Sequence, residues 1–204
     1  MTTTEVSVGH QPLVLHTRPV FDMSEELFFD FCQTNREWRI ERTAEGDVLI
    51  MPPTAGETGN QNAFVTTSLT TWTLQNGTGV SFDSSTGFTL PNRATRSPDA
   101  AWVKRSRLVL LTSEQKKRFL PLCPDFVIEL RSPSDHLKTL QDKMQEYIEN
   151  GALLGWLLDT PNRQVYVYRP GRAVECLENP STISGDPELP GFVLDLATIW
   201  EPSF

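Results

Sequence analysis

The chain has 204 residues, a formal net charge of -8, and 38% hydrophobic and 9% aromatic residues, a composition that indicates a folded domain and excludes a disordered chain. The N-terminus lacks a basic start with an apolar core, and no apolar run approaches the roughly 20 residues of a membrane helix. We therefore expect a cytoplasmic protein without a secretion signal. The three cysteines lie far apart without a CxxC pair, which is typical of a reducing compartment and argues against a zinc site.

The first half of the chain predicts a lead-in followed by helices and strands. Residues 1–20 are interpreted as extended and loosely tied, because prolines break any helix there. The elements predicted next are a helix within residues 22–35 with Ser24 as N-cap, two strands in residues 38–42 and 47–51, a helix over residues 58–75, and two strands within residues 79–92.

The second half predicts more strands, one long helix and a hairpin. These elements are a strand over residues 99–104, a short polar helix at 113–119, a strand over 124–131, a helix with Ser132 as N-cap and Pro133 in its first position, and a hairpin over 153–170. The C-terminal segment is expected to pack back on the core. This order predicts one mixed α/β domain over residues 21–204, with a central mixed β-sheet flanked by helices.

The charge is unevenly distributed along the chain. Residues 93–118 include eight basic and two acidic residues, so this stretch carries +6 and the remainder carries -14. One interpretation is a solvated hairpin and helix. The other is an arm that contacts phosphates, because affinity for nucleic acid depends on local contacts as well as on total charge.

One acid stands inside a strand that otherwise looks buried. Glu129 lies in the segment PDFVIELRSPSD, residues 124–135, and burying a carboxylate costs several kcal/mol unless a cation, a metal or a proton compensates it. Because strand residues alternate sides, Asp125, Glu129 and Arg131 share one face. Asp99 starts another strand 30 residues earlier, which leaves enough chain for the two strands to be neighbours.

Two carboxylates on neighbouring strands can converge on one point. Such hard oxygen ligands suit Mg²⁺ or Mn²⁺, which keep water molecules and accept phosphate oxygens. The alternative is that Glu129 forms an ion pair with Arg131 or Lys143 and binds no metal. The residues alone leave both interpretations open.

Four segments in order carry a resemblance to a known superfamily: RSPD at 96–99, PDFVIELRSPSD at 124–135, KMQEY at 143–147, and GWLLD followed by VYVYRPG. They resemble the PD-(D/E)XK nucleases, and within them a bacterial family of Uma-type restriction endonucleases. The resemblance covers the chain from about Phe21 onward and implies a restriction endonuclease-like core.

The resemblance implies roles for several acids. Asp99 and Glu129 would bind Mg²⁺, with Mn²⁺ as a substitute and the backbone carbonyl of Leu130 as a further ligand. Glu57 matches an acid that many members place beside the metal. Taken by itself, Glu57 is equally well interpreted as an acid of the first helical turn that the helix dipole favours.

The chain departs from the superfamily pattern two residues after Glu129. The pattern requires lysine there, but the residue is Arg131, which stays protonated and cannot act as a base. Similar proteins supply the lysine from the following helix, where Lys138 and Lys143 are the candidates. At 100° per residue, Lys143 lies about 95° and Lys138 about 125° from the centre of the apolar stripe, so Lys143 is predicted.

The resemblance therefore implies a metal-dependent DNA endonuclease. Its catalytic residues would be Glu57, Asp99, Glu129 and Lys143, and its DNA contacts would be Lys104, Arg105, Arg107 and Arg131. The alternative is a catalytically weak or inactive nucleic-acid-binding or protein-binding module on the same fold, which the missing lysine and the acidic net charge favour. A glycoside hydrolase ranks last, because only the two carboxylates support it. A homodimer is expected by analogy alone.

Overall fold

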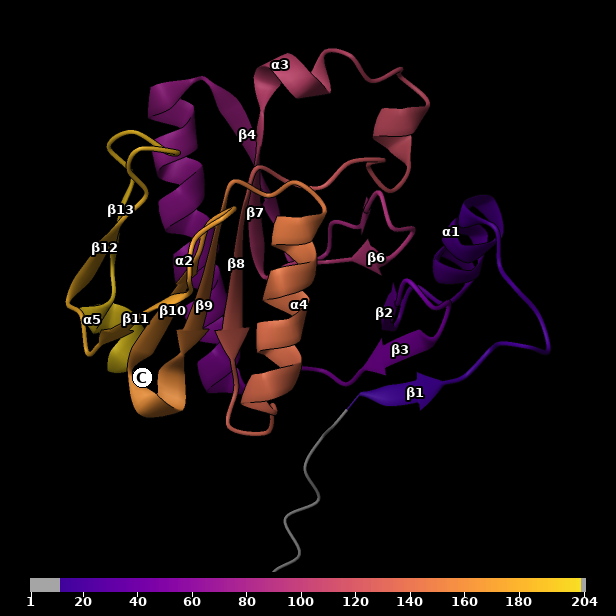
Figure 1. The fold of residues 1–204 in the computed structure, drawn as a ribbon, viewed down its shortest axis with the longest axis horizontal. Helices are drawn as coiled ribbons and strands as arrows, with labels where there is room; N and C mark the ends of the chain where they lie inside the picture. The colour runs from indigo at the N-terminus through magenta and orange to yellow at the C-terminus, as the bar shows by residue number, and fades with distance from the viewer. Residues whose placement is uncertain (1–11, 203–204) are drawn as a thin grey trace, which may run out of the picture.

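The computed structural model describes residues 12–202, which form a large β-sheet with helices on both faces and a smaller sheet beside it (Figure 1). Residues 1–11 of the predicted lead-in lie outside the described residues. Part of the rest of the lead-in is not loose, because Leu13–Leu15 form a strand that pairs with a later strand. Within the described range, no helix has the length and apolar character needed to cross a membrane.

The large sheet has six strands and is the predicted central mixed sheet. Its order is β11 (Glu175–Glu178), β10 (Gln164–Tyr168), β9 (Leu154–Asp159), β8 (Phe126–Arg131), β7 (Ala100–Lys104) and β4 (Gly79–Asp83). β8 and β9 are parallel, whereas the other pairs are antiparallel. The two strands that carry the predicted acids are neighbours, with Ala100 opposite Ile128.

The smaller sheet has five strands and lies against the N-terminal helix. Its order is β1 (Leu13–Leu15), β3 (Val48–Met51), β2 (Arg39–Arg42), β6 (Thr95–Arg96) and β5 (Phe88–Thr89). β4 and β5, which the sequence predicts on either side of a turn, therefore belong to different sheets. A third pair, β12 (Thr182–Ser184) and β13 (Val193–Asp195), comes from the C-terminal segment.

The helices are α1 (Glu25–Thr34), α2 (Gly56–Asn76), α3 (Arg105–Leu108), α4 (Leu137–Glu149) and α5 (Ala197–Trp200), with 3-10 turns at Gln115–Lys117 and Thr160–Asn162. Ser24 caps α1 as predicted, because its side chain accepts a hydrogen bond from the Leu27 N–H. Gly77 ends α2 in the left-handed conformation, with φ 71°.

The start of α4 differs from the sequence prediction. The predicted N-cap, Ser132, lies five residues before the first helical residue, and Leu137 is the first residue of the helix. The carboxylate of Asp135 accepts hydrogen bonds from both the N–H and the hydroxyl of Ser132. This side chain closes a separate turn, so the chain enters the helix only after it.

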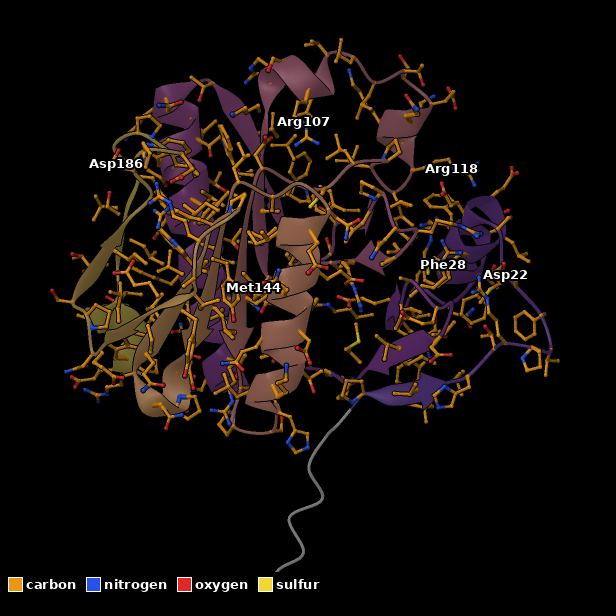
Figure 2. The ribbon with its side chains drawn as sticks, viewed as in Figure 1. Asp22, Phe28, Arg107, Arg118, Met144 and Asp186 are labelled. Carbon is orange, nitrogen blue, oxygen red and sulfur yellow. The ribbon has the colours of Figure 1, made fainter. Side chains whose placement is uncertain are left out.

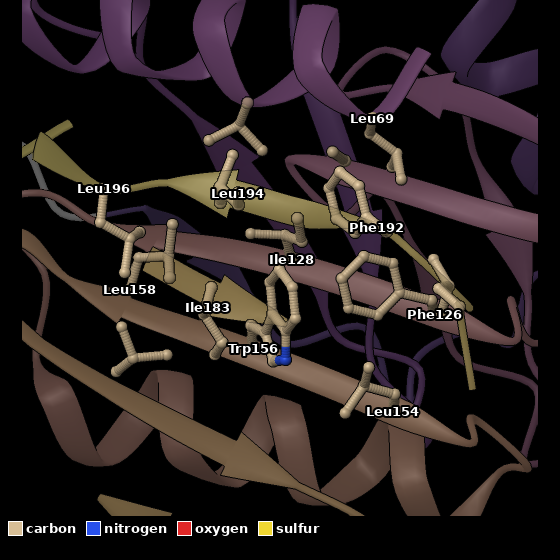
Figure 3. Close-up of a cluster of buried hydrophobic side chains, with 14 of the residues drawn as sticks. Leu69, Phe126, Ile128, Leu154, Trp156, Leu158, Ile183, Phe192, Leu194 and Leu196 are labelled. Atoms are coloured by element: carbon tan, nitrogen blue, oxygen red, sulfur yellow. The ribbon is translucent and has the colours of Figure 1, made fainter. Parts of the chain in front are cut away.

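Two hydrophobic cores lie on opposite faces of the central sheet. On one face, Ile128 and Trp156 pack with Leu69 of α2 and with Phe192 and Leu194 of the C-terminal segment (Figure 3), so this segment does pack back on the core. On the other face, Val127, Leu157 and their neighbours pack against Met144 and Tyr147 of α4. Odd-numbered residues of β8 therefore face α4, and this direction decides where Glu129 points.

Candidate functional site

Asp99 lies directly before β7 and joins this strand to β8. The residue is 6% exposed, and its Oδ2 accepts a hydrogen bond from the N–H of Leu130 at 2.8 Å. Its Oδ1 accepts from Nη1 of Arg39 at 3.3 Å and from Nδ2 of Asn62 at 3.1 Å. Arg39 comes from β2 and Asn62 from α2, so three parts of the fold converge on one carboxylate.

Glu129 points from β8 toward α4 and is 3% exposed. Its Oε1 accepts a hydrogen bond from the hydroxyl of Tyr147 at 3.0 Å and lies 2.8 Å from Nζ of Lys143. The cation beside this buried acid is therefore Lys143 and not Arg131, which pairs with the fully buried Asp159 at 2.9 Å. Lys143 was the lysine chosen from the sequence.

A third buried acid, Glu41, joins the group and was not predicted. It lies on β2 and is 2% exposed. Its Oε1 is 3.0 Å from Nζ of Lys143 and accepts a hydrogen bond from the N–H of Ser97 at 3.0 Å. Arg96 lies 3.3 Å from its Oε2 and also binds Glu146 of α4 at 2.6 Å. Lys143 thus bridges the small sheet and the central sheet.

We call Arg39, Glu41, Asp99, Glu129 and Lys143 the acid cluster. Burial raises the pKa of Glu129 to about 7, and the charges of Asp99 and Glu41 add to this effect, while Lys143 opposes it. Burial alone would also raise the pKa of Glu41, but Lys143, Arg96 and Arg39 lower it to about 2. The cluster therefore contains one carboxyl group that titrates near neutral pH and one that stays ionised.

Two other candidates lie away from the acid cluster. Lys138 is exposed and pairs with Asp142 one turn along α4. Glu57 is exposed in the first turn of α2, the position that the helix dipole favours. It is five residues from Asn62, about 140° around the helix, so the two side chains leave α2 in different directions. The acid that reaches the acid cluster from the small sheet is Glu41, which lies on β2.

Lys104, Arg105 and Arg107 lie at the other end of β7 from Asp99, and the five residues of this strand separate the two ends by about 17 Å. Arg105 donates to the carbonyls of Gly77 and Gly79, and Arg107 pairs with Asp125 at 3.2 Å. In Figure 2, Arg107 lies beside α3, well apart from Met144 in the middle of α4. The structure does not bring these three residues to the acid cluster.

A hydrated cation at the acid cluster would take few ligands from the protein. Among residues 12–202, no group of three or more His, Cys, Asp or Glu side chains is arranged so that it could hold a metal ion by itself. Mg²⁺ commonly takes one or two carboxylates and completes its shell with water and phosphate oxygens. Beside Asp99, Nε of Arg39 and Oδ1 of Asn62 are buried without a hydrogen-bond partner within the described residues. A water molecule bound to a cation could donate a hydrogen bond to Oδ1 of Asn62. The cation would then share the carboxylate of Asp99 with Arg39.

The sequence offered little signal for the residues that were missed. Arg39 and Glu41 alternate with Ile40 in a short strand, a pattern that usually indicates a solvent-facing polar side. Glu41 becomes buried where β2 pairs with β6 and where its side chain meets Lys143 of α4. Asn62 gave no signal, because α2 contains many other polar residues. The one available signal for Arg39 and Glu41 was that a charged residue lies in a predicted strand. Glu129 shows this signal more clearly, because apolar residues surround it in the sequence.

Comparisons with known proteins agree with this fold. The sequence model of one protein family, described as "Uma2: Putative restriction endonuclease", matches residues 25–197. A crystal structure from Anabaena variabilis, described as "a putative nuclease belonging to DUF820", matches with a TM-score of 0.73 and 18% sequence identity, over 87% of this chain and 97% of the other. At this identity the likeness shows the fold alone. No curated protein matches the chain.

Proposed function

Because the chain belongs to the Uma2 family, described as "Putative restriction endonuclease", we propose that it is a metal-dependent endonuclease that hydrolyses phosphodiester bonds in DNA. One observation carries the proposal. Two buried carboxylates, Asp99 and Glu129, come from neighbouring strands, and Lys143 lies 2.8 Å from one of them. Buried acids next to a fixed cation are costly to maintain, and they are common at catalytic sites.

Asp99 and Glu129 would hold Mg²⁺ or Mn²⁺. The bound ion would polarise the scissile phosphate and favour attack by water. Asp99 is fixed for this role by the N–H of Leu130, and Glu129 is fixed by the hydroxyl of Tyr147. Both carboxylates are therefore oriented before any ligand arrives, which lowers the cost of forming the site.

Lys143 would orient water and stabilise phosphate charge, and it would not accept a proton. Burial by itself would lower its pKa, but Glu129 and Glu41 raise it above its ordinary value. The ammonium group therefore stays charged and acts as a hydrogen-bond donor. In this proposal Glu41 takes the supporting role that the sequence assigned to Glu57, because Glu41 contacts Lys143 directly.

Arg39 and Arg131 would bind the phosphate backbone close to the cut. Arg39 already lies against Asp99, and Arg131 shares a strand face with Glu129 while Asp159 holds its guanidinium group in place. A planar guanidinium suits phosphate oxygens. The basic residues at the far end of β7 can contact flanking DNA only, because about 17 Å of strand separates them from the acid cluster.

One feature favours a non-catalytic binding module instead. Arg39 pairs with Asp99, and Lys143 pairs with both Glu41 and Glu129, so each of the three acids already has a cation from the protein. A cluster neutralised in this way is stable without a metal. The two functions differ in a measurable way, because only the nuclease requires a divalent ion.

The test is calorimetric titration of the protein with Mg²⁺ and Mn²⁺, in the presence of a phosphate-bearing oligonucleotide. We expect the native protein to bind the metal ion and Glu129→Gln to lose this binding. Glu149→Gln is the control and should bind the ion unchanged, because Glu149 is exposed at the end of α4. Binding that persists in Glu129→Gln would exclude the metal assignment. Absence of binding in all three proteins would favour the binding module.

A further inference from the structure

A groove runs along α2, and one of its lining residues, Asn62, contacts Asp99 of the acid cluster. Its volume is about 390 Å³. On the helix it is lined by Gly59, Asn62, Ala63 and Thr66, which recur at the spacing of one helical face. The opposite wall is the end of β4 and the turn after it. We call this feature the α2 groove.

The α2 groove leads to Asp99 by two independent routes. Asn62 lines the groove and also donates a hydrogen bond to Oδ1 of Asp99 at 3.1 Å. Asp83 lines the opposite wall and lies opposite Ala100, the residue that follows Asp99, in the pairing of β4 with β7. A ligand in the groove would therefore lie next to Asp99, the carboxylate that is proposed to hold the metal.

The lining of the groove does not suit phosphate. Its lining includes the polar residues Thr54, Thr67, Ser84 and Asn62, but no lysine or arginine. Its one charged residue, Asp83, is an acid whose Oδ1 accepts hydrogen bonds from Ser85 and Thr86. Phosphates bind where basic groups neutralise them, whereas neutral donors and acceptors pair with base edges and sugars.

The size of the groove restricts the occupant further. Sites for small ligands commonly have volumes of about 300–1,000 Å³, and 390 Å³ lies near the lower end, which suits a ligand of the size of a single nucleoside. Gly59 and Ala63 have little or no side chain, so a flat ring can approach the helix closely. A base can enter such a site only if it is unpaired or leaves the base stack.

We propose that the α2 groove binds the base and sugar of one unpaired nucleotide next to the scissile phosphate, so that the preferred substrate is single-stranded or locally opened DNA. The inference rests on the proposed nuclease function, because Asp99 links the groove to the reacting phosphate. Asn62 then has two roles, since it holds Asp99 with its amide nitrogen and forms the inner end of the nucleotide site.

The test measures DNA binding by fluorescence anisotropy in Glu129→Gln protein, which prevents cleavage. The probes have one sequence in three forms: single strand, matched duplex, and duplex with one bulged nucleotide. Ala63→Phe fills the groove from an exposed position, and Thr71→Phe places the same ring on an exposed position of α2 outside the groove. Both variants are first compared with the parent by melting temperature, so that misfolding is recognised.

We expect the single strand and the bulged duplex to bind more tightly than the matched duplex. Ala63→Phe should weaken both by at least about tenfold, because its ring fills the space proposed for the base, and Thr71→Phe should change them less than about twofold. Tighter binding of the matched duplex, or equal effects of the two phenylalanines, would overturn this inference and leave the nuclease proposal intact. Failure of every DNA form to bind would also overturn this inference, whereas the nuclease proposal is tested separately by the calorimetric titration of the native protein.

Discussion

Two Pro-Asp pairs lie at opposite ends of the same strand pair. Pro98-Asp99 precedes β7, and Pro124-Asp125 precedes β8, which runs antiparallel to it. Both aspartates are buried, and each accepts one N–H from the other strand at 2.8 Å, Asp99 from Leu130 and Asp125 from Lys104. Locally, the two residues do the same thing: each carboxylate closes one end of the two-stranded ladder.

Their surroundings differ. Asp125 has one charged partner in the described structure, Arg107, which is partly exposed. Asp99 has Arg39 as a partner and lies close enough to Glu129 to raise its pKa. The comparison shows that a Pro-Asp pair builds a structural cap in either place. At the Asp99 end it becomes a candidate metal ligand, because β2, β8 and α4 bring other charges close to it.

The largest expected effect separates the two aspartates directly. Asparagine keeps the oxygen that accepts the backbone N–H and removes the charge, so both caps should survive the substitution. Asp99→Asn should lower the rate of Mg²⁺-dependent DNA cleavage by about a hundredfold or more, because a charge at the reacting centre is lost. Asp125→Asn should change the rate less than about threefold. The measurement is single-turnover cleavage, and equal losses in both variants would abolish the distinction.

The next prediction compares the cations at the two ends. Lys143→Met leaves Glu41 and Glu129 buried beside an apolar side chain, and it should lower the free energy of unfolding by about 3 kcal/mol. Arg107→Met should cost about 1 kcal/mol, because Arg107 is partly exposed and Asp125 keeps its hydrogen bond from the backbone. Denaturant unfolding at neutral pH measures both values.

Lys138→Met is the control for the removal of a lysine from α4. Lys138 is exposed, so its loss should change the free energy of unfolding by no more than about 0.5 kcal/mol. If Lys143→Met were as mild as Lys138→Met, the acid cluster would be more solvated than its burial indicates. Lys143 would then lose its proposed role as the bridge between the two sheets.

The smallest expected effect is a pH dependence at the Asp99 end. The pKa of Glu129 is raised from 4.5 to about 7, so its contribution to stability is complete below about pH 4.5 and is lost as the pH rises through 7. The pKa of Glu41 is lowered to about 2, so its contribution is present above about pH 4.5 and is lost as the pH falls through 2.

Glutamine imitates the protonated carboxyl group of Glu129. In the presence of a chelator, Glu129→Gln should therefore become more stable relative to the native protein as the pH rises from 5 to 8. Melting temperatures of the two proteins at several pH values measure this difference. A difference that stays constant over this range would show that Lys143 keeps Glu129 ionised throughout.

The sequence was sufficient for most of the elements because their signals are local. The Ser24 cap and the glycine after α2 mark helix ends, and alternating or continuous apolar runs mark strands. Ser132 misled the prediction at α4 because its side chain and that of Asp135 bind each other in a turn. Such a competing local bond leaves no trace in the periodicity of the residues.

For the candidate site, the sequence by itself showed that Asp99 and Glu129 can lie at neighbouring strands and that Lys143 lies on the flank of the buried face of its helix, and the family resemblance added weight to Lys143. These conclusions follow from the alternation of strand residues and the 100° step of a helix. Only the tertiary structure decided that Glu41 meets Lys143, 102 positions away, and that Lys104 lies at the far end of β7 from Asp99. Contacts of that range depend on how the two sheets pack, because no local pattern records which distant charge will offset a buried one.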